Sequence, residues 1–198
     1  MNITQSTEPG NIVGNKVVLR PIKEEDLQIF MTWVNHPEIF HYLNKTMPIT
    51  FEEELAWYYR SKQNPKDRID FTILDKETEN PIGTLGVHHM DNINGVAYTG
   101  TIISTEYQCC GYATEAKMLL LNYVFSHYNV RVIYSYIKGY NEKSIAYATK
   151  CGYKEITRFP KHYFRESDGK YHDRVIMVVE KDEWIRDYWT EYTKRYNL

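Results

Sequence analysis

The residues whose types and spacing most clearly suggest a ligand-binding function form the stretch QCCGYAT, residues 108–114. The stretch follows a β-like run, 98–103, and opens a helix-like run, 114–125. A loop of small residues at a helix N-terminus presents backbone N–H groups without intrahelical partners. Together with the helix dipole, these groups favour an anion such as a pyrophosphate. Gly111 and Ala113 are small enough to let such a ligand approach the backbone. The spacing therefore predicts an anion-binding loop.

The adjacent cysteines of this loop also invite a redox or nucleophilic interpretation. A helix N-terminus lowers the pKa of a thiol, so a thiolate at Cys109 or Cys110 is chemically reasonable. An adjacent pair nevertheless has poor geometry for an ordinary disulfide, and the sequence assigns no partner histidine. Cys151 falls late in a helix-like segment, where packing is the simpler role. We therefore do not expect catalytic cysteine chemistry at this loop.

The elements that must position the loop follow from hydrophobic periodicity and turn residues. Thr50 and Glu53 form a capping-box pattern at one helix start, and residues 166–170 are typical of a hairpin turn. The alternation predicts one mixed α/β domain. The expected strands are 16–22, 69–74, 81–88, 96–103, 130–137, 153–165 and 171–180, and the expected helices are 23–35, 50–62, 114–125, 141–151 and 182–196.

The bulk composition is that of an ordinary globular domain of 198 residues, with 42% hydrophobic and 25% charged residues. A net charge of -2 gives no reason to expect nucleic acid or an anionic membrane as partner. No apolar run approaches the roughly 20 residues that span a bilayer. Three cysteines without CxxC spacing argue against a disulfide framework or a metal site and favour a reducing cytoplasm. We expect a flexible tail over 1–14 and one domain over 15–198, with a final helix from about 182.

Several motifs, in order along the chain, resemble the GNAT (GCN5-related) N-acetyltransferase family. The pattern Gln108-x-x-Gly111-x-Ala113, between a strand and a helix, matches the family's Q/R-x-x-G-x-G/A loop. Asn141-x-x-Ser144, followed by the run 150–153, is similar to its second cofactor segment. The stretches 20–21, 33–38, 112–116 and 169–173 resemble the branch of ribosomal-protein-alanine N-terminal acetyltransferases. The resemblance covers about residues 16–180.

This resemblance implies a single-domain GNAT fold, with a mixed, mostly antiparallel sheet of about seven strands flanked by helices. It also implies acetyl-CoA as co-substrate, without a metal. Backbone N–H groups of residues 109–114 would bind the pyrophosphate, while strand residues before the loop would pair with the pantetheine arm. The cofactor-binding residues expected on this basis are Ile102, Ile103, Gln108, Cys109, Cys110, Gly111, Tyr112, Ala113, Thr114, Asn141 and Ser144.

At the catalytic positions, this chain departs from the pattern of the family it resembles. Many members place a tyrosine acid seven residues after the asparagine, where this chain has Ala148. Tyr147 is about 100° away around the helix, so it is no automatic substitute; Ser144 or water is the expected proton donor to the CoA thiolate, with Tyr147 as a further catalytic candidate. For the general base, the family's fourth-strand position holds Tyr98. The sixth-strand position falls on His162 or the neighbouring Tyr163, and an unperturbed histidine has a suitable pKa of about 6.5.

The resemblance implies a primary amine as acceptor, and the resemblance to the branch favours a protein N-terminal α-amine. Small-molecule acceptors, such as an aminoglycoside, an amino sugar or a polyamine, are the alternative. A non-catalytic CoA-binding regulatory module is a second alternative, because Ala148 and Tyr98 stand where catalytic residues are common. The acidic clusters 24–26 and 52–54 would attract a cationic amine or simply face solvent. The aromatic stripe of the last helix, 184–196, fits packing on the domain or a dimer contact, so a monomer or homodimer is expected.

Overall fold

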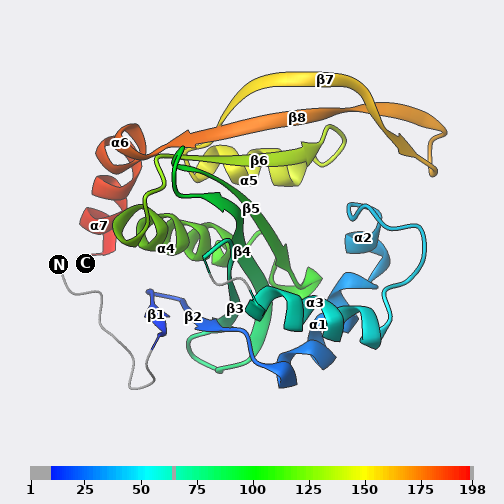
Figure 1. The fold of residues 1–198 in the computed structure, drawn as a ribbon, viewed down its shortest axis with the longest axis horizontal. Coiled ribbons are helices and arrows are strands. Elements are labelled where there is room, and N and C mark those ends of the chain that lie inside the picture. Colours follow the sequence, from blue (N-terminus) through cyan, green and yellow to red (C-terminus); the bar gives the residue numbers. More distant parts are fainter. Residues whose placement is uncertain (1–9, 64–65, 197–198) are drawn as a thin grey trace.

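One eight-stranded sheet organises the residues that the computed structural model describes, 10–63 and 66–196 (Figure 1). The strand order is β1-β2-β3-β4-β5-β6-β8-β7. Every neighbouring pair is antiparallel except β5 and β6, which are parallel, so the predicted mixed, mostly antiparallel sheet is confirmed. The strands are β1 (Ile12–Val13), β2 (Val17–Pro21), β3 (Ile69–Asp75), β4 (Pro81–Asp91), β5 (Val96–Ile103), β6 (Val132–Lys138), β7 (Lys154–Arg165) and β8 (Lys170–Glu180).

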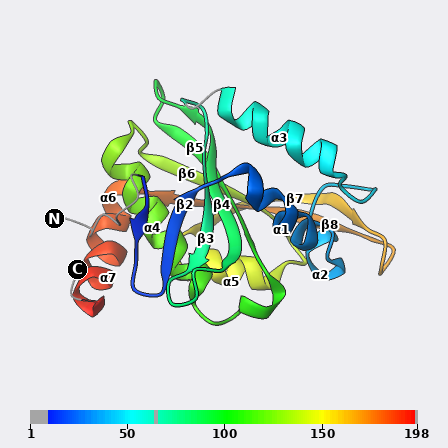
Figure 2. The ribbon, with the colours of Figure 1, turned by 90° about the horizontal axis from the view of Figure 1, so that it is seen from below.

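Helices cover both faces of this sheet. Figure 2 shows α3 on one side of the strands and α4 and α5 on the other. The predicted capping box forms at the start of α3, where the Glu53 N–H donates to the Thr50 hydroxyl and the Thr50 N–H donates to the Glu53 carboxylate. The helices are α1 (Leu27–Val34), α2 (Pro37–Phe40), α3 (Phe51–Gln63), α4 (Tyr112–His127), α5 (Glu142–Lys150), α6 (Lys181–Trp184) and α7 (Thr190–Tyr196).

Two short elements depart from the sequence prediction. Within the predicted tail 1–14, Ile12 and Val13 pair with β2, and Ile12 is buried. Residues 12–13 therefore belong to the sheet, and the rest of the predicted tail, over 1–9, lies outside the described residues. His36-Pro37 ends α1 as predicted, but the His36 ring also accepts a hydrogen bond from the Glu38 N–H and caps α2. Elements of two and four residues are too short to produce a hydrophobic period.

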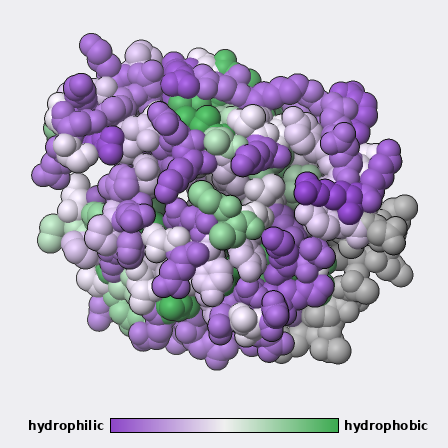
Figure 3. Space-filling model, turned by 180° about the vertical axis from the view of Figure 1, so that it is seen from behind, coloured by the Kyte–Doolittle hydropathy of each residue, from purple (hydrophilic) through white to green (hydrophobic). Residues whose placement is uncertain are grey.

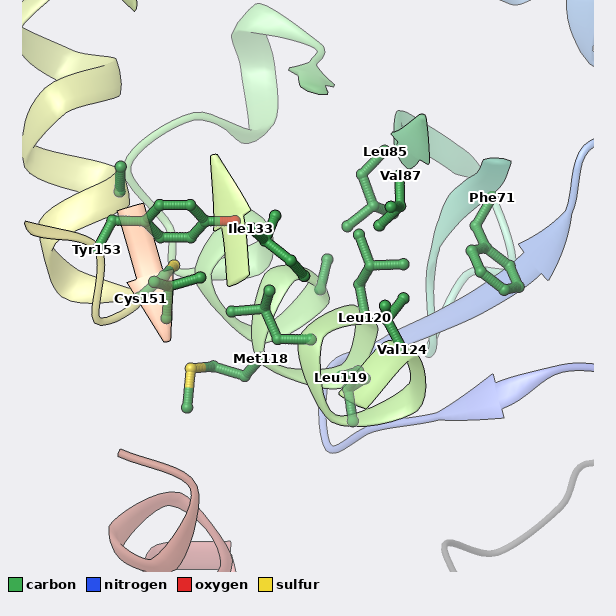
Figure 4. Close-up of a cluster of buried hydrophobic side chains, with 14 of the residues drawn as sticks. Phe71, Leu85, Val87, Met118, Leu119, Leu120, Val124, Ile133, Cys151 and Tyr153 are labelled. Carbon is green, nitrogen blue, oxygen red and sulfur yellow. The ribbon is translucent and has the colours of Figure 1, made fainter. Parts of the chain in front are cut away.

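The main core lies between the sheet and α4, whose side chains are buried on most of its circumference. Leu120 and Val124 of α4 point toward Phe71, Leu85 and Val87 of the sheet (Figure 4). Cys151 and Tyr153 lie beside each other at the other end of the same cluster (Figure 4). The face seen in Figure 3 is mostly hydrophilic, with small hydrophobic groups scattered over it. Burial of α4 thus fixes the helix whose N-terminus follows the predicted anion loop.

The first helix is anchored to the sheet by a buried ion pair. The Arg20 guanidinium donates to Asp26 at 2.6 Å, and the Thr72 hydroxyl donates to the other carboxylate oxygen at 2.7 Å. The Lys23 N–H also donates to this carboxylate, at 2.9 Å. Because all sides of the carboxylate are engaged, this member of the acidic cluster 24–26 has a structural role.

The predicted last helix consists of α6, a π-helical turn over Ile185–Trp189, and α7. Trp184 is buried, and its indole N–H donates to the Cys151 carbonyl at 3.0 Å. Tyr192 is also buried. The aromatic stripe therefore packs on its own domain, in agreement with the first of the two interpretations of its spacing.

Candidate functional site

The two parallel strands at the centre of the sheet separate partway along their length. β5 and β6 pair only through residues 96–98 with 132–134. Beyond that point β5 stays paired to β4 as far as Ile103, and β6 stays paired to β8 as far as Lys138. The facing edges of residues 99–103 and 135–137 therefore have no strand between them. A ligand with amide groups can hydrogen-bond there as an added strand does.

A cavity of about 580 Å³ occupies this opening. It extends from the separating strands to the loop before α4 and to the cavity-facing side of α5. This volume is within the range of about 300–1,000 Å³ that holds small molecules and cofactors. Its lining combines backbone edges, small loop residues and a few polar side chains, which suits a long ligand with one anionic end.

The predicted anion loop has the backbone geometry of an anion cradle. Cys109 and Gly111 adopt left-handed conformations, with φ of 61° and 88°, on either side of Cys110. Alternating left- and right-handed residues turn successive N–H groups toward a common point. Within the described residues, the N–H groups of 109–114 donate no hydrogen bond, and the first helical bond joins the Glu115 N–H to the Gly111 carbonyl. These free donors are what an anion requires.

Most of the site residues predicted from the sequence lie together in the cavity lining. They come from three separate elements: the end of β5, the loop into α4, and the first turns of α5. Asn141 caps α5 by accepting a hydrogen bond from the Ser144 N–H at 3.1 Å, which fixes the start of that helix in the cavity wall. The predicted residues that line the cavity are Ile102, Ile103, Gln108, Cys109, Gly111, Ala113, Thr114, Asn141, Ser144 and Tyr147.

Three predicted residues have side chains outside this lining. The Cys110 side chain is exposed and donates to the Gln108 carbonyl. The Tyr112 hydroxyl donates to Asp75 at 2.7 Å, so that its side chain ties α4 to β3. His162 is exposed on β7, where its ring lies against Tyr163. Only backbone groups of Cys110 and Tyr112 remain available to a ligand. The position of His162 gives no support to its predicted role as base, which stays a prediction.

Paired threonine and tyrosine hydroxyls line the closed end of the cavity, near the point where β5 and β6 separate. Thr101 and Tyr147 share a hydrogen bond of 3.2 Å, and Thr99 and Tyr153 share one of 2.9 Å. Burial raises the pKa of both phenols well above the usual range, the threonine hydrogen bonds lowering it only in part. Tyr147 therefore carries a neutral hydroxyl that is already engaged with β5.

Lys117 is the cavity residue that sequence reasoning missed. It is 3% exposed, and its Nζ lies 5.9 Å from the ring centroids of both Tyr147 and Tyr153. Burial lowers the pKa of its ammonium to about 8, and the neighbouring Cys151 raises it only in part. A usable signal was its position three residues after Thr114, since residues three apart share a helix face.

The segment after α1 forms part of the wall at the other, open end of the cavity. Glu38, Tyr42 and Leu43 contribute to the lining there. The Lys138 ammonium donates to the Leu43 carbonyl at 2.9 Å, which holds this segment against β6. Glu38 is exposed at this mouth, where its carboxylate can meet a cation. The cluster 52–54 instead lines a separate surface depression with Lys45 and Arg60, which leaves it outside the cavity.

A second aromatic group lies on the neighbouring strands. The ring centroids of Tyr98 and Tyr136 are 5.2 Å apart, and those of Tyr98 and His88 are 6.3 Å apart. Burial, then the nearby Arg68, lowers the pKa of His88 to about 4. His88 is therefore neutral at physiological pH. Tyr136 also lines the cavity, so this aromatic group continues the cavity wall.

Fold and cavity together define an acetyltransferase. The chain belongs to the GNAT acetyltransferase family, since the family model described as "Acetyltransferase (GNAT) domain" matches residues 16–154. Among curated proteins, the chain is similar to spermidine N(1)-acetyltransferase of Escherichia coli K12, with 24% identity over 177 residues, 89% of this chain and 92% of that protein. The predicted family and enzyme class are thereby confirmed.

The solved structures that share the fold include two with different acceptors in their descriptions. The spermidine N-acetyltransferase of Vibrio cholerae in complex with CoA and spermine gives a TM-score of 0.77 at 23% identity, covering 87% of this chain and 99% of that one. RimL, a ribosomal L7/L12 α-N-protein acetyltransferase in complex with CoA, gives a TM-score of 0.76 at 16% identity. The match covers 86% of this chain and 97% of that one. These likenesses confirm the predicted GNAT fold. Both acceptor classes considered from the sequence occur among these relatives.

Proposed function

We propose that this protein transfers an acetyl group from acetyl-CoA to the primary amine of a small, cationic, polyamine-like molecule. The observation that carries the proposal is the continuity of the cavity. It joins the unpaired N–H groups of residues 109–114 to the open edges of β5 and β6 and ends at Glu38. A donor with an anionic end and an amide-containing arm fits the first two parts, and a protonated amine fits the third.

The loop before α4 would hold the pyrophosphate of acetyl-CoA through backbone N–H groups. This arrangement explains why Cys109 and Cys110 can stand where the family often has glycine and a basic residue. Lys143 and Lys150 of α5 line the same cavity and supply positive charge that the loop itself lacks. The arm of the donor would pair with the open edge of β5 at Ile102 and Ile103.

The reaction then joins a neutral amine to the thioester carbonyl carbon. A backbone N–H of β5 would polarise the carbonyl oxygen as negative charge develops there. The new C–N bond forms, the C–S bond breaks, and the sulfur leaves with the electron pair. The sequence suggests Ser144 or water as the source of the proton that this sulfur takes up. Tyr147, with its hydroxyl held by Thr101, would position β5 against α5. Much of the rate would come from holding both substrates together.

Glu38 and the aromatic wall support a cationic acceptor. A carboxylate at the cavity mouth attracts a protonated amine, and a tyrosine ring such as that of Tyr42, which lines the cavity with Glu38, favours ammonium groups. The similarity to spermidine acetyltransferases over nearly their whole length agrees with this choice. A protein N-terminal α-amine is the second candidate, supported by the Asn141-x-x-Ser144 spacing and the likeness to RimL.

An acceptor panel tests the proposal. Purified protein is incubated with acetyl-CoA and spermidine, spermine, an aminoglycoside or a short peptide with a free N-terminus, and both CoA release and acetylated product are measured. We expect CoA and N-acetylpolyamine in equal amounts. Equal turnover of the peptide would favour the second candidate, and absence of any acetylated product would contradict the proposal. Glu38→Gln should raise KM for the polyamine, with Glu191→Gln on α7 as the matched control.

The cellular setting belongs to the same proposal. We propose a cytoplasmic location, which agrees with three cysteines that form no disulfide. Within the described chain, no helix is long and apolar enough to cross a membrane. A monomer or homodimer stays a prediction, and its measurement is the mass in solution by light scattering.

A further inference from the structure

Lys117 is a buried cation without a counter-ion. Its side chain enters the cavity from α4, one helical turn beyond Thr114, and is 3% exposed. Among the described residues, its Nζ has neither a hydrogen-bond acceptor nor a carboxylate partner, and it lies 5.9 Å from the ring centroids of Tyr147 and Tyr153. Burial of a charge without a partner is costly. An uncompensated cation in a ligand cavity therefore points to an anion that arrives with the ligand.

The location of Lys117 indicates which anionic group of the ligand would lie beside it. The pyrophosphate has its own donors in the loop 109–114, which precedes Lys117 at the N-terminus of α4. Lys117 instead lies by Tyr153, whose hydroxyl bonds Thr99, the first residue of β5 beyond its pairing with β6. It thus occupies the closed end of the opening between the strands. In the proposed reaction, the negative charge that develops within this opening is the thiolate of departing CoA.

The usual source of a proton is missing from this end of the cavity. Ala148 stands at the position of the family's tyrosine, and its side chain carries no proton donor. The Tyr147 hydroxyl is engaged with Thr101, and burial raises its pKa. A lysine whose pKa is about 8 is close to the value of about 8.5 for an ordinary thiol, so a proton can pass between them at little cost.

We propose that Lys117 is the catalytic residue that neutralises and protonates the CoA thiolate, in place of the missing tyrosine. This inference rests on the proposed function. As the C–S bond breaks, the sulfur keeps the electron pair and takes a proton from the Lys117 ammonium. The side chain of Lys117, now a neutral amine, regains a proton from water in the cavity. The nitrogen of the acceptor, which has formed the new C–N bond, loses a proton to solvent. The other groups facing Lys117 are Tyr147, Tyr153, Cys151 and, more distantly, His88 on β4.

The pKa values of these neighbours leave Lys117 as the group that titrates near neutral pH. Burial, opposed in part by Lys117 and Lys150, raises the pKa of the Cys151 thiol to about 12. Both tyrosines stay neutral for the reasons given above, and His88 stays neutral above about pH 4. The proposed pair of sulfur and ammonium should therefore dominate the pH dependence of CoA binding between about pH 6 and 9.

Binding of CoA and of desulfo-CoA, which lacks the sulfur, tests the proposal without an acceptor. Titration calorimetry at pH 8 compares the wild type, Lys117→Met, Lys117→Arg and the matched control Lys194→Met on the exposed face of α7. We expect the wild type and the control to bind CoA at least tenfold more tightly than desulfo-CoA. Lys117→Met should bind both equally, and Lys117→Arg should keep most of the preference. An undiminished preference in Lys117→Met would overturn the proposal.

Desulfo-CoA also separates failure of this inference from failure of the proposed function. If the wild type binds neither nucleotide, the proposed function itself is wrong. If Lys117→Met binds desulfo-CoA as the wild type does, the variant is folded and its cavity intact. Its kcat with the best amine should then fall at least tenfold, with KM for acetyl-CoA changed by less than threefold. Detection of acetyl-Lys117 by mass spectrometry would instead identify this residue as an acetyl acceptor and overturn its role as donor.

Discussion

The left-handed backbone at Gly111 leads to a prediction that separates binding from stability. In Gly111→Ala, the new Cβ would meet no atom within 4 Å, so steric crowding contributes nothing. The cost comes from φ of 88°, which disfavours an L side chain by about 1–2 kcal/mol. Reduced freedom of the unfolded chain offsets about 0.4–1 kcal/mol of this. We expect a net loss of about 1 kcal/mol, or a Tm roughly 2–4 °C lower for a domain of this size.

Relief of this strain would rotate the peptide units next to residue 111 and turn N–H groups away from the anion. Loss of one hydrogen bond to a charged group, about 1.5 kcal/mol, corresponds to roughly tenfold weaker binding of acetyl-CoA. Gly169→Ala is the matched control, because Gly169 has φ of 64° and equally open surroundings in the turn between β7 and β8. Thermal unfolding measures stability, and titration calorimetry measures affinity. We expect both variants to lose similar amounts of stability. Only Gly111→Ala should bind acetyl-CoA more weakly. Equal affinity in the two variants would refute the role given to the loop backbone.

Three further predictions concern groups around the site. Asp26→Ala should lower the free energy of unfolding by about 3–5 kcal/mol in urea, since it leaves Arg20 buried without its partner; a loss below about 1 kcal/mol would show that the pair is unimportant. Because burial lowers the pKa of His88 to about 4, below its unfolded value of 6.5, its neutral form stabilises the fold above pH 6.5 and this contribution is lost as the pH falls toward 4. Allowing for partial exposure, the wild type should lose about 2 kcal/mol more than His88→Gln between pH 7 and pH 4.5 in urea unfolding, whereas parallel pH profiles would contradict the assignment. Tyr147→Phe removes the hydrogen bond to Thr101 and should cost about 1 kcal/mol of stability while kcat stays within threefold; a tenfold fall in kcat would restore Tyr147 as the acid.

The sequence was most informative where periodicity and glycine positions act locally. The strand β5, the loop 108–114 and the start of α4 were predicted together because each follows from nearby residues. The cap at Asn141 and the hairpin between β7 and β8 were predicted for the same reason. β1 was missed because two residues establish no period, and only pairing with β2 makes them a strand.

The catalytic side chains depend on long-range packing, so the sequence predicted them less well. Lys117 reads as a surface residue, yet it is buried because α4 is surrounded by the sheet, α5 and the last helices. The segment with Glu38 is held at the cavity by hydrogen bonds from Lys138 and Tyr140 to the carbonyls of His41 and Leu43, nearly a hundred residues away in the chain. His162 was chosen by alignment to a family position, and no local pattern shows on which side of β7 it falls.

A crystal structure of the protein with acetyl-CoA tests the central claim most directly. We predict pyrophosphate oxygens within about 3.2 Å of at least two N–H groups of residues 109–114, at hydrogen-bond distance. We also predict the thioester in the opening between β5 and β6, with its sulfur facing Lys117. A pyrophosphate bound away from the α4 N-terminus, or a thioester outside this opening, would contradict the account.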